Sequence, residues 1–519
     1  MIDVDASRLA LVELRQARRH NHRDAVHWID ALYRVYISGL VAVIAVVVGA
    51  GLFGDGKLTP AEQQSFVDAA IPWLGLGFAF AVSIGMRSGG RGGPLTLEAA
   101  TVQHELQAPI PYEVTLREPA LKQMRFIAFT GMSVGGIVGV LAVRRFPENP
   151  IEIVLACAAA FALAGVLAIS TAMIFSGRRV SRPLSNVLAL ALLLWSVADI
   201  IFKTTTSPMT LLGSLACAGV TFNPLSLIVV VLTAVAAVAA VASLGGTSID
   251  DARRRAGLVS QLRFAVTLQD IRTVVLLRRQ LAQETPRARP WIPMKRGGRM
   301  PAVWRRDWRS YFRYPISRLA RMILLAVIAG VCLGLTWRGI KPAFLISAIA
   351  LYLAGYDAVE PLAQEVDHPS RWDDLPEDHG RLLLTHLPAA FVVMVFVCLV
   401  TAASALILAP SSVVLALLPL EIAPVAAAAM AGAALSTVMG SPDVAKMLGG
   451  LGADVMGFVL MARLVFPPAL TAAALAAMFA AGGNPDALDT SRVSNLVGYS
   501  LFVSAGALIY IRYQKPARI

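Results

Sequence analysis

Long apolar runs alternate with short polar or basic segments along the whole chain. A bilayer-spanning helix needs roughly 20 apolar residues, and twelve runs approach or exceed this length. They lie near residues 34–54, 66–86, 126–143, 151–175, 183–202 and 225–244 in the first half, and near 319–338, 342–357, 386–408, 413–438, 464–480 and 493–511 in the second. Since the bilayer core offers the backbone no hydrogen-bond partner, each run is expected to be helical. The pattern predicts an all-α polytopic membrane protein with about 12 transmembrane helices.

Composition supports the membrane class. The 519 residues are 57% hydrophobic and 15% charged, with a mean hydropathy of +0.66, which excludes an ordinary soluble globule. Four cysteines lie in apolar runs at no ligand-like spacing, so neither a disulfide framework nor a metal site is expected.

The distribution of basic residues predicts the orientation. If the N-terminus is cytoplasmic, 39 of the 46 Lys and Arg residues fall on the cytoplasmic side. Both termini are therefore expected to face the cytoplasm, in a plasma membrane. The first 30 residues lack the apolar core of a cleavable signal peptide. The net charge of +13 then indicates contacts with anionic membrane lipids rather than with nucleic acid.

Two similar patterns indicate an internal repeat. Arg34-x-x-Ile37-Ser38-x-Leu40 precedes the first run, and Arg313-x-x-Ile316-Ser317-x-Leu319 precedes the seventh. Each motif is followed by two apolar runs and then by a Pro-Leu-x-x-Glu segment. A six-helix unit that starts inside and has an even number of helices gives two parallel copies. The expected divisions are a first half at 1–245 with an N-terminal amphipathic helix, a cytoplasmic helical linker at 246–303, and a second half at 304–519.

The two Pro-Leu segments are long for loops between neighbouring helices, and long ordered loops are usually functional. In the first, Leu95, Leu97, Val102 and Leu106 alternate with polar residues, which predicts a short surface helix with one apolar face and one face for a partner. The second is acidic, which suggests a docking site on a basic inner surface. The candidate coupling residues are Pro94, Leu95, Glu98, His104, Glu105, Pro361, Leu362, Glu365, Asp367, Asp373 and Asp374. A merely solvated loop remains open as an alternative.

Catalytic motifs give no support for an enzyme. The stretch GLFGDGKL at Gly51–Leu58 has Leu58 where a phosphate-binding loop needs Ser or Thr, and no strand is expected before it. Ionisable residues inside apolar runs are costly, so Asp199 and Glu421 are candidates for a translocation path. Asp199 can equally lie at the outer interface beside Lys203, and Glu421, between Pro419 and Pro424, can have a buried structural role.

These features resemble the type-two ABC exporter permeases, in the duplicated form found in high-GC Gram-positive bacteria. The resemblance rests on an amphipathic helix before the first span, six spans per unit, and the stretches SGGRGGPLTLEAATVQHEL, LRFAVTLQDIRTVVLLRRQLAQE and EPLAQEVDHPSRWDDLP. It covers nearly the whole chain and implies that both transmembrane halves belong to one chain in a bacterial plasma membrane. It also implies separate ATPase subunits, which would bind ATP and Mg²⁺, while this chain would hold no cofactor. Pro94 to Leu106 and Pro361 to Leu375 would be the coupling segments.

The substrate expected from an apolar path is hydrophobic or amphiphilic. Two other classes stay open: a 12-helix secondary transporter like those of the major facilitator fold, and a membrane-bound polymer synthase or scaffold. Against the secondary transporter stand the long segments that replace its short loop between the second and third spans.

Overall fold

The structure is a computed structural model. It describes residues 58–90, 93–97, 101–108, 110–146, 149–267, 286–294, 301–341, 343–367, 378–439, 453–476 and 490–513, together with residues 13, 16, 273, 274, 277 and 280. All regular elements within these ranges are helices. The internal contacts divide the chain into two units, Met1–Gln261 and Leu262–Ile519, and the division falls inside the expected linker.

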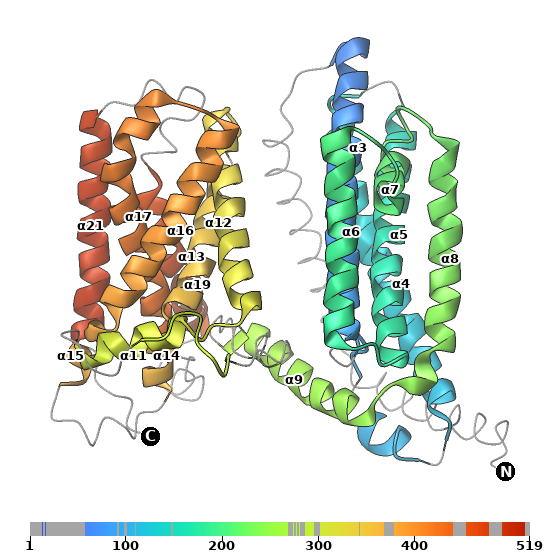
Figure 1. Cartoon of the computed structure of the whole chain (residues 1–519), viewed down its shortest axis with the longest axis horizontal. Coiled ribbons are helices and arrows are strands. Elements are labelled where there is room, and N and C mark those ends of the chain that lie inside the picture. The colour runs from blue at the N-terminus through green and yellow to red at the C-terminus, as the bar shows by residue number, and fades with distance from the viewer. Residues whose placement is uncertain are drawn as a thin grey trace. The chain divides into compact units, whose positions relative to one another are not determined.

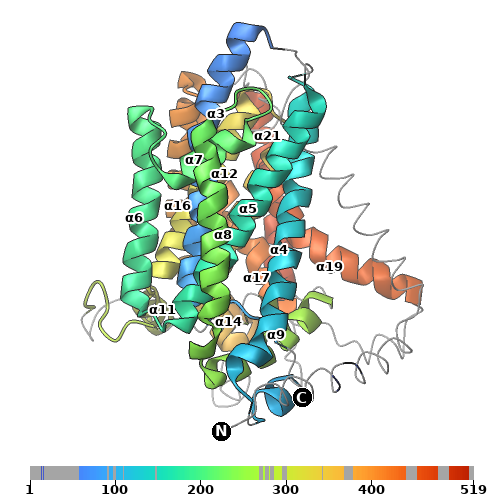
Figure 2. The same cartoon turned by 90° about the vertical axis from the view of Figure 1, so that its right-hand side faces the viewer.

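Unit 1 is a bundle of long helices. Its elements are α3 (Pro60–Gly89), α4 (Tyr112–Val143), α5 (Pro150–Gly177), α6 (Arg182–Phe202), α7 (Pro208–Ala216) and α8 (Leu227–Ala242), with a single π-helical turn at Thr101–Glu105 and α9 (Ile249–Thr267) after the bundle. The start of α3 is fixed by a capping box, in which the Thr59 backbone N–H donates to the Glu62 carboxylate over 2.8 Å. Figures 1 and 2 show α3 to α8 side by side, with α9 leading away from one end.

Unit 2 combines long helices with short ones at one end of the bundle. The elements are α11 (Ala302–Tyr311), α12 (Ile316–Trp337), α13 (Ala343–Ala358), α14 (Glu360–Val366), α15 (His379–Thr385), α16 (Leu387–Leu408), α17 (Ser412–Met439), α19 (Ala453–Ala474) and α21 (Thr490–Tyr513). α11, α14 and α15 lie at the same end of the unit (Figure 1). We call this the α11 end of unit 2.

Four helix pairs recur in the two units when the helices are matched by the expected six-helix repeat. In unit 1, α3 packs on α5 and α6, α4 packs on α5, and α5 packs on α8. In unit 2, α13 packs on α17 and α19, α16 packs on α17, and α17 packs on α21. In unit 2, α13 also packs on α16, and α19 packs on α17 and α21, whereas the described helices of unit 1 show no comparable α3–α4, α5–α6 or α6–α8 packing.

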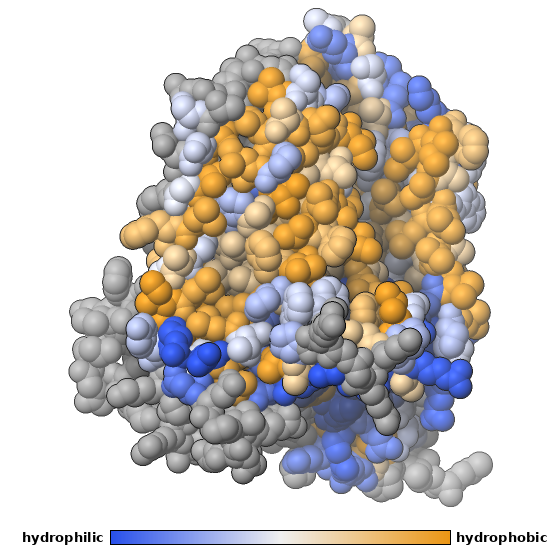
Figure 3. Space-filling view, turned by 60° about the vertical axis from the view of Figure 1, so that its left-hand side comes forward, coloured by the Kyte–Doolittle hydropathy of each residue, from blue (hydrophilic) through white to orange (hydrophobic). Residues whose placement is uncertain are grey.

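Among the described residues, eight helices are long and apolar enough to cross a membrane, or nine if the bent pair α13–α14 forms one span. The chain is thus an all-helical, multi-pass membrane protein. The expected run at 34–54 lies outside the described residues. Those at 464–480 and 493–511 correspond to α19 and α21, whose apolar stretches among the described residues are shorter: Val465–Ala474 and Ser500–Tyr513. The helices carry many exposed large apolar side chains, including Ile323, Ile328 and Phe396, and Figure 3 shows an extended apolar face above a hydrophilic end.

Helix α7 was not expected from the sequence. Its nine residues lie in a segment interpreted as an outer loop, yet Met209, Thr210, Leu212 and Gly213 are buried against α3 and α5. The crossing with α3 is close because both helices present glycine there. A Cβ atom at Gly75 would lie 2.7 Å from the Cα atom of Thr210, and one at Gly213 would lie 2.3 Å from the carbonyl oxygen of Ile71.

Candidate functional site

The second Pro-Leu segment forms α14, which turns by 60° from α13 at the α11 end of unit 2. Pro361 occupies the first turn, where proline costs no backbone hydrogen bond. Pro361 and Leu362 are buried, and Leu362 belongs to the same apolar cluster as Tyr311 and Val359. One side of α14 is therefore part of the core of the unit.

An ion pair ties α14 to α11. Glu365 is only 2% exposed, and its carboxylate accepts a hydrogen bond from the guanidinium of Arg306. Arg306 itself is about half exposed. Glu365, predicted from sequence as a docking residue, therefore points into the unit, and its contact holds the segment in place.

A second buried pair joins α11 to the beginning of α16. The Nδ1 atom of His386 lies 2.9 Å from Oδ2 and 3.0 Å from Oδ1 of Asp307. Both side chains are almost fully buried. Asp307 follows Arg306 directly, so one turn of α11 makes polar contacts with two different elements.

Two tyrosines and an arginine fix the end of α13. The hydroxyl of Tyr311 donates to the carbonyl oxygen of Ala358 over 2.5 Å, and that of Tyr314 donates to the carbonyl oxygen of Asp357 over 2.8 Å. Burial raises the pKa of Tyr311 well above its usual value, which keeps the phenol protonated as a donor. Arg321 of α12 binds the Asp357 carboxylate with two hydrogen bonds of 2.8 and 2.6 Å. The bend between α13 and α14 is thus held from α11 and from α12.

The outward side of α14 carries Gln364 and Asp367, both exposed. Asp367 follows the last residue of the helix. Asp373 and Asp374 lie outside the described residues. The second segment therefore has one exposed polar side on a short helix whose other side is buried.

The first Pro-Leu segment is attached in a different way. Residues 93–97 have no regular structure, and the π-helical turn Thr101–Glu105 follows. The side-chain amide of Gln123 in α4 donates to the carbonyl oxygen of Pro94 over 2.9 Å, and its oxygen accepts from the backbone N–H of Thr96 over 3.1 Å. Within its described residues, the short helix predicted for this segment is therefore limited to the turn Thr101–Glu105.

The apolar face predicted for this segment is confirmed. Leu95, Leu97, Val102 and Leu106 are all buried, in one cluster with residues of α4 and α5. Glu105 is also buried, Glu98 lies outside the described residues, and His104 is placed only by its backbone in the π-helical turn.

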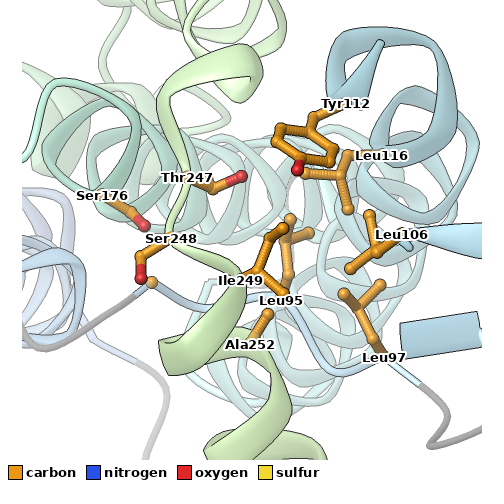
Figure 4. A pocket seen from close by; sticks show the side chains of 11 residues that line it. Leu95, Leu97, Leu106, Tyr112, Leu116, Ser176, Thr247, Ser248, Ile249 and Ala252 are labelled. Atoms are coloured by element: carbon orange, nitrogen blue, oxygen red, sulfur yellow. The ribbon is translucent and has the colours of Figure 1, made fainter. Parts of the chain in front are cut away.

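Helix α9 covers the first segment from the other side. Figure 4 shows Ile249 and Ala252 of α9 beside Leu95, with Leu106 and Leu116 across a small apolar slot. Arg255 of α9 donates to the carbonyl oxygen of Gly93. A wider cavity of about 790 Å³ adjoins this slot and is lined by polar groups that include Gln107, Arg179 and Asp250.

Asp199 lies near the end of α6 with its carboxylate fully engaged. It accepts hydrogen bonds from the hydroxyls of Thr204, Thr206 and Thr210 and from the backbone N–H groups of Thr206 and Ser207. These donors lie at the start of α7 and in the turn before it. These hydrogen bonds anchor the start of α7 to the end of α6, and they use both oxygen atoms of the Asp199 carboxylate.

Glu421 has the opposite environment. It is 3% exposed within α17, and neither carboxylate oxygen has a hydrogen-bond partner among the described residues. Of the two candidates for a translocation path, the Asp199 carboxylate is fully hydrogen-bonded, whereas the Glu421 carboxylate has no hydrogen-bond donor among the described residues.

The polar contacts around α14 were not found by sequence reasoning. Asp357, Arg306, Asp307 and Arg321 are not among the candidate site residues that the sequence indicated. The sequence around them, Trp304-Arg-Arg-Asp307-Trp308, does not show which of these charges is paired, because the partners Glu365 and His386 lie far along the chain. Among the described residues, no group of three His, Cys, Asp or Glu side chains is placed to hold a metal ion.

No family model, curated protein or solved structure matches this chain.

Proposed function

We propose that this chain is the transmembrane subunit of an ATP-driven exporter in a bacterial plasma membrane, with both transmembrane halves in one polypeptide. Separate ATPase subunits, which bind ATP and Mg²⁺, dock on the two Pro-Leu segments. Their closure pushes on these segments and rocks the helices, so that a hydrophobic or amphiphilic substrate crosses between the halves. This chain performs no chemistry of its own.

The attachment of α14 is the observation that carries the proposal. A segment that transmits force needs one face for a partner and stiff contacts to the helices that move. α14 exposes Gln364 and Asp367, while Glu365, Leu362 and Pro361 bind it to α11 and to the core. A solvated loop needs neither the buried ion pair nor the apolar side.

The first segment supports the same role with a different attachment. The cluster of Leu95, Leu97, Val102 and Leu106 and the clasp by Gln123 hold it against α4. Since the exposed faces of the two segments differ in sequence, the two docking sites are unequal, and two ATPase subunits of different affinity or identity suit them best.

A duplicated architecture of twelve spans is part of the proposal. The four helix pairs that recur in both units support two copies of a six-helix unit. The basic residues at the α11 end, including Arg306, Arg318 and Arg321, support a cytoplasmic location for that end and for both termini.

A proton-coupled secondary transporter is the second candidate, favoured by one observation. The buried Glu421 without a partner is the kind of residue that binds protons in such transporters. That class gives no role to the fastened α14 segment, and the dependence on ATP separates the two candidates.

The test is to purify the chain from its native host in mild detergent and to identify co-purifying proteins by mass spectrometry. The expected result is a stoichiometric ATPase, whose recovery falls with Asp367→Lys. The matched control is Lys341→Glu, a charge reversal at an exposed residue before α13, far along the helix from α14. A chain that purifies alone and transports in vesicles with a proton gradient and no ATP contradicts the proposal.

A further inference from the structure

The contact between α17 and α21 has a regular pattern on both helices. The buried positions Leu417, Glu421, Pro424, Ala428, Ala431 and Leu435 recur every three or four residues along one face of α17. Those of α21 recur in the same way: Val493, Val497, Ser500, Ser504, Ala507 and Ile511. Residues at this spacing lie on one side of a helix, so α21 presents one buried stripe. From Pro424 onward α17 is buried on its other sides as well, and the positions given above are one of its faces.

Two apolar clusters fix how the stripes align. Leu417 packs with Val493 and Val497. Further along, Ala431 and Leu435 pack with Ala507. The residue numbers rise together on both helices, so the helices run parallel. Glu421 lies one turn beyond Leu417, so this alignment places it near the level of Val497 and Ser500 on α21, and Ser504 follows one turn further along.

The polar side chains along this part of the seam offer hydrogen-bond acceptors. The hydroxyl of Ser500 donates to the carbonyl oxygen of Val497 over 3.0 Å, and that of Ser504 donates to the carbonyl oxygen of Ser500 over 2.7 Å. Because both protons are directed to the backbone of α21, the serine oxygens are left as acceptors. The Glu421 carboxylate is acceptor-only when ionised, and it has no donor among the described residues.

Acceptors inside an apolar seam are complementary to a positive charge. The clusters on either side, around Leu417 with Val493 and around Leu435 with Ala507, suit an apolar body. Pro419 and Pro424 each lack the N–H that would close a helical hydrogen bond, so the backbone of α17 is weakened on both sides of Glu421. The seam can therefore open at this level more readily than elsewhere along α17.

We propose that the α17–α21 seam is a binding site for lipophilic cations, in which Glu421 supplies the counter-charge and the Ser500 hydroxyl supplies a further oxygen atom. The inference rests on the proposed function, which it sharpens: the exported amphiphile carries a positive charge. In unit 1 the buried carboxylate of α6, Asp199, instead accepts hydrogen bonds from hydroxyl and N–H donors.

The test uses the purified full chain in lipid nanodiscs without ATPase subunits and measures binding of tetraphenylphosphonium by equilibrium dialysis, with empty nanodiscs as the blank. Glu421→Gln is expected to weaken binding by at least about tenfold, because it removes the buried counter-charge. Glu421→Asp keeps the charge and is expected to keep most of the affinity. Glu152→Gln changes an exposed carboxylate in α5 of unit 1 and is the matched control.

Equal binding by wild type and Glu421→Gln overturns the proposal and leaves Glu421 as a proton site. Wild-type binding no greater than that of empty nanodiscs also overturns it. If Glu421→Gln loses tetraphenylborate binding to the same extent as tetraphenylphosphonium binding, it has lost its fold rather than a cation site, and Glu421→Asp then decides. Loss of tetraphenylphosphonium binding alone in Glu421→Asp overturns the proposal, and retention of that binding supports it. Since no ATPase takes part, failure here leaves the proposed exporter function standing.

Discussion

The Nδ1 atom of His386 lies 2.9 Å from a carboxylate oxygen of Asp307, and both side chains are buried. This contact fastens α11 to the first turn of α16, beside the α14 segment. Replacing Asp307 with Ala leaves the ring nitrogen of His386 buried without its partner, at an expected cost of about 1–3 kcal/mol. The melting temperature of the purified chain should fall, whereas Asp68→Ala, at an exposed position of α3, should leave it unchanged.

The Arg306–Glu365 pair predicts an asymmetric response to mutation. Arg306→Ala leaves the almost fully buried Glu365 carboxylate without its counter-charge, whereas Glu365→Gln removes the charge that needed compensation. Breaking a buried pair from one side is costly when a charge remains. The melting temperature should therefore fall further with Arg306→Ala than with Glu365→Gln. An equal or reversed order would show that the pair does not hold α14.

The glycine contact between α3 and α7 can be tested with two substitutions on one helix. Gly75→Ala places a methyl group 2.7 Å from the Cα atom of Thr210, so a backbone must move, at about 1–3 kcal/mol for overpacking. Gly77→Ala meets no atom within 4 Å and gains helix propensity. The first variant should melt at a lower temperature and the second at an equal or higher one. Equal behaviour of the two variants would mean that α7 does not pack there.

The Asp199 cap should control access to the end of α7. Asp199→Ala removes the acceptor of the hydroxyls and N–H groups at the start of α7, so the helix should detach more often. Cys217 follows α7 directly and is half-buried. Its rate of labelling by a maleimide should rise several-fold in the variant. An unchanged rate would show that the packing of α7 does not depend on Asp199.

Hydrophobic periodicity was sufficient for the parts of the fold that depend on local pattern. The run at 151–175 became α5, Pro150–Gly177, and the spacing of Leu95, Leu97, Val102 and Leu106 identified the buried face of the first segment. The α5 run is long and apolar enough to span a bilayer, and the apolar residues of the first segment are buried because they are removed from water together.

Features that depend on distant residues could not be predicted in this way. Glu365 looked like an exposed acidic residue, and its burial depends on Arg306, which lies 59 positions earlier. Helix α7 is shorter than a membrane span and begins in a Ser- and Thr-rich stretch, so its pattern resembled a loop. Its burial depends on the close approach of Gly75 and on the cap by Asp199.

A site-specific cross-link from α14 tests the central claim most directly. Asp367→Cys provides an exposed thiol on the proposed docking face, and Lys341→Cys provides one before α13. With a short bifunctional cross-linker in native membranes, we expect the thiol at position 367 to capture an ATPase, identified by mass spectrometry, and the thiol at position 341 to capture none. Capture of no ATPase from position 367, or equal capture from both positions, would contradict the account.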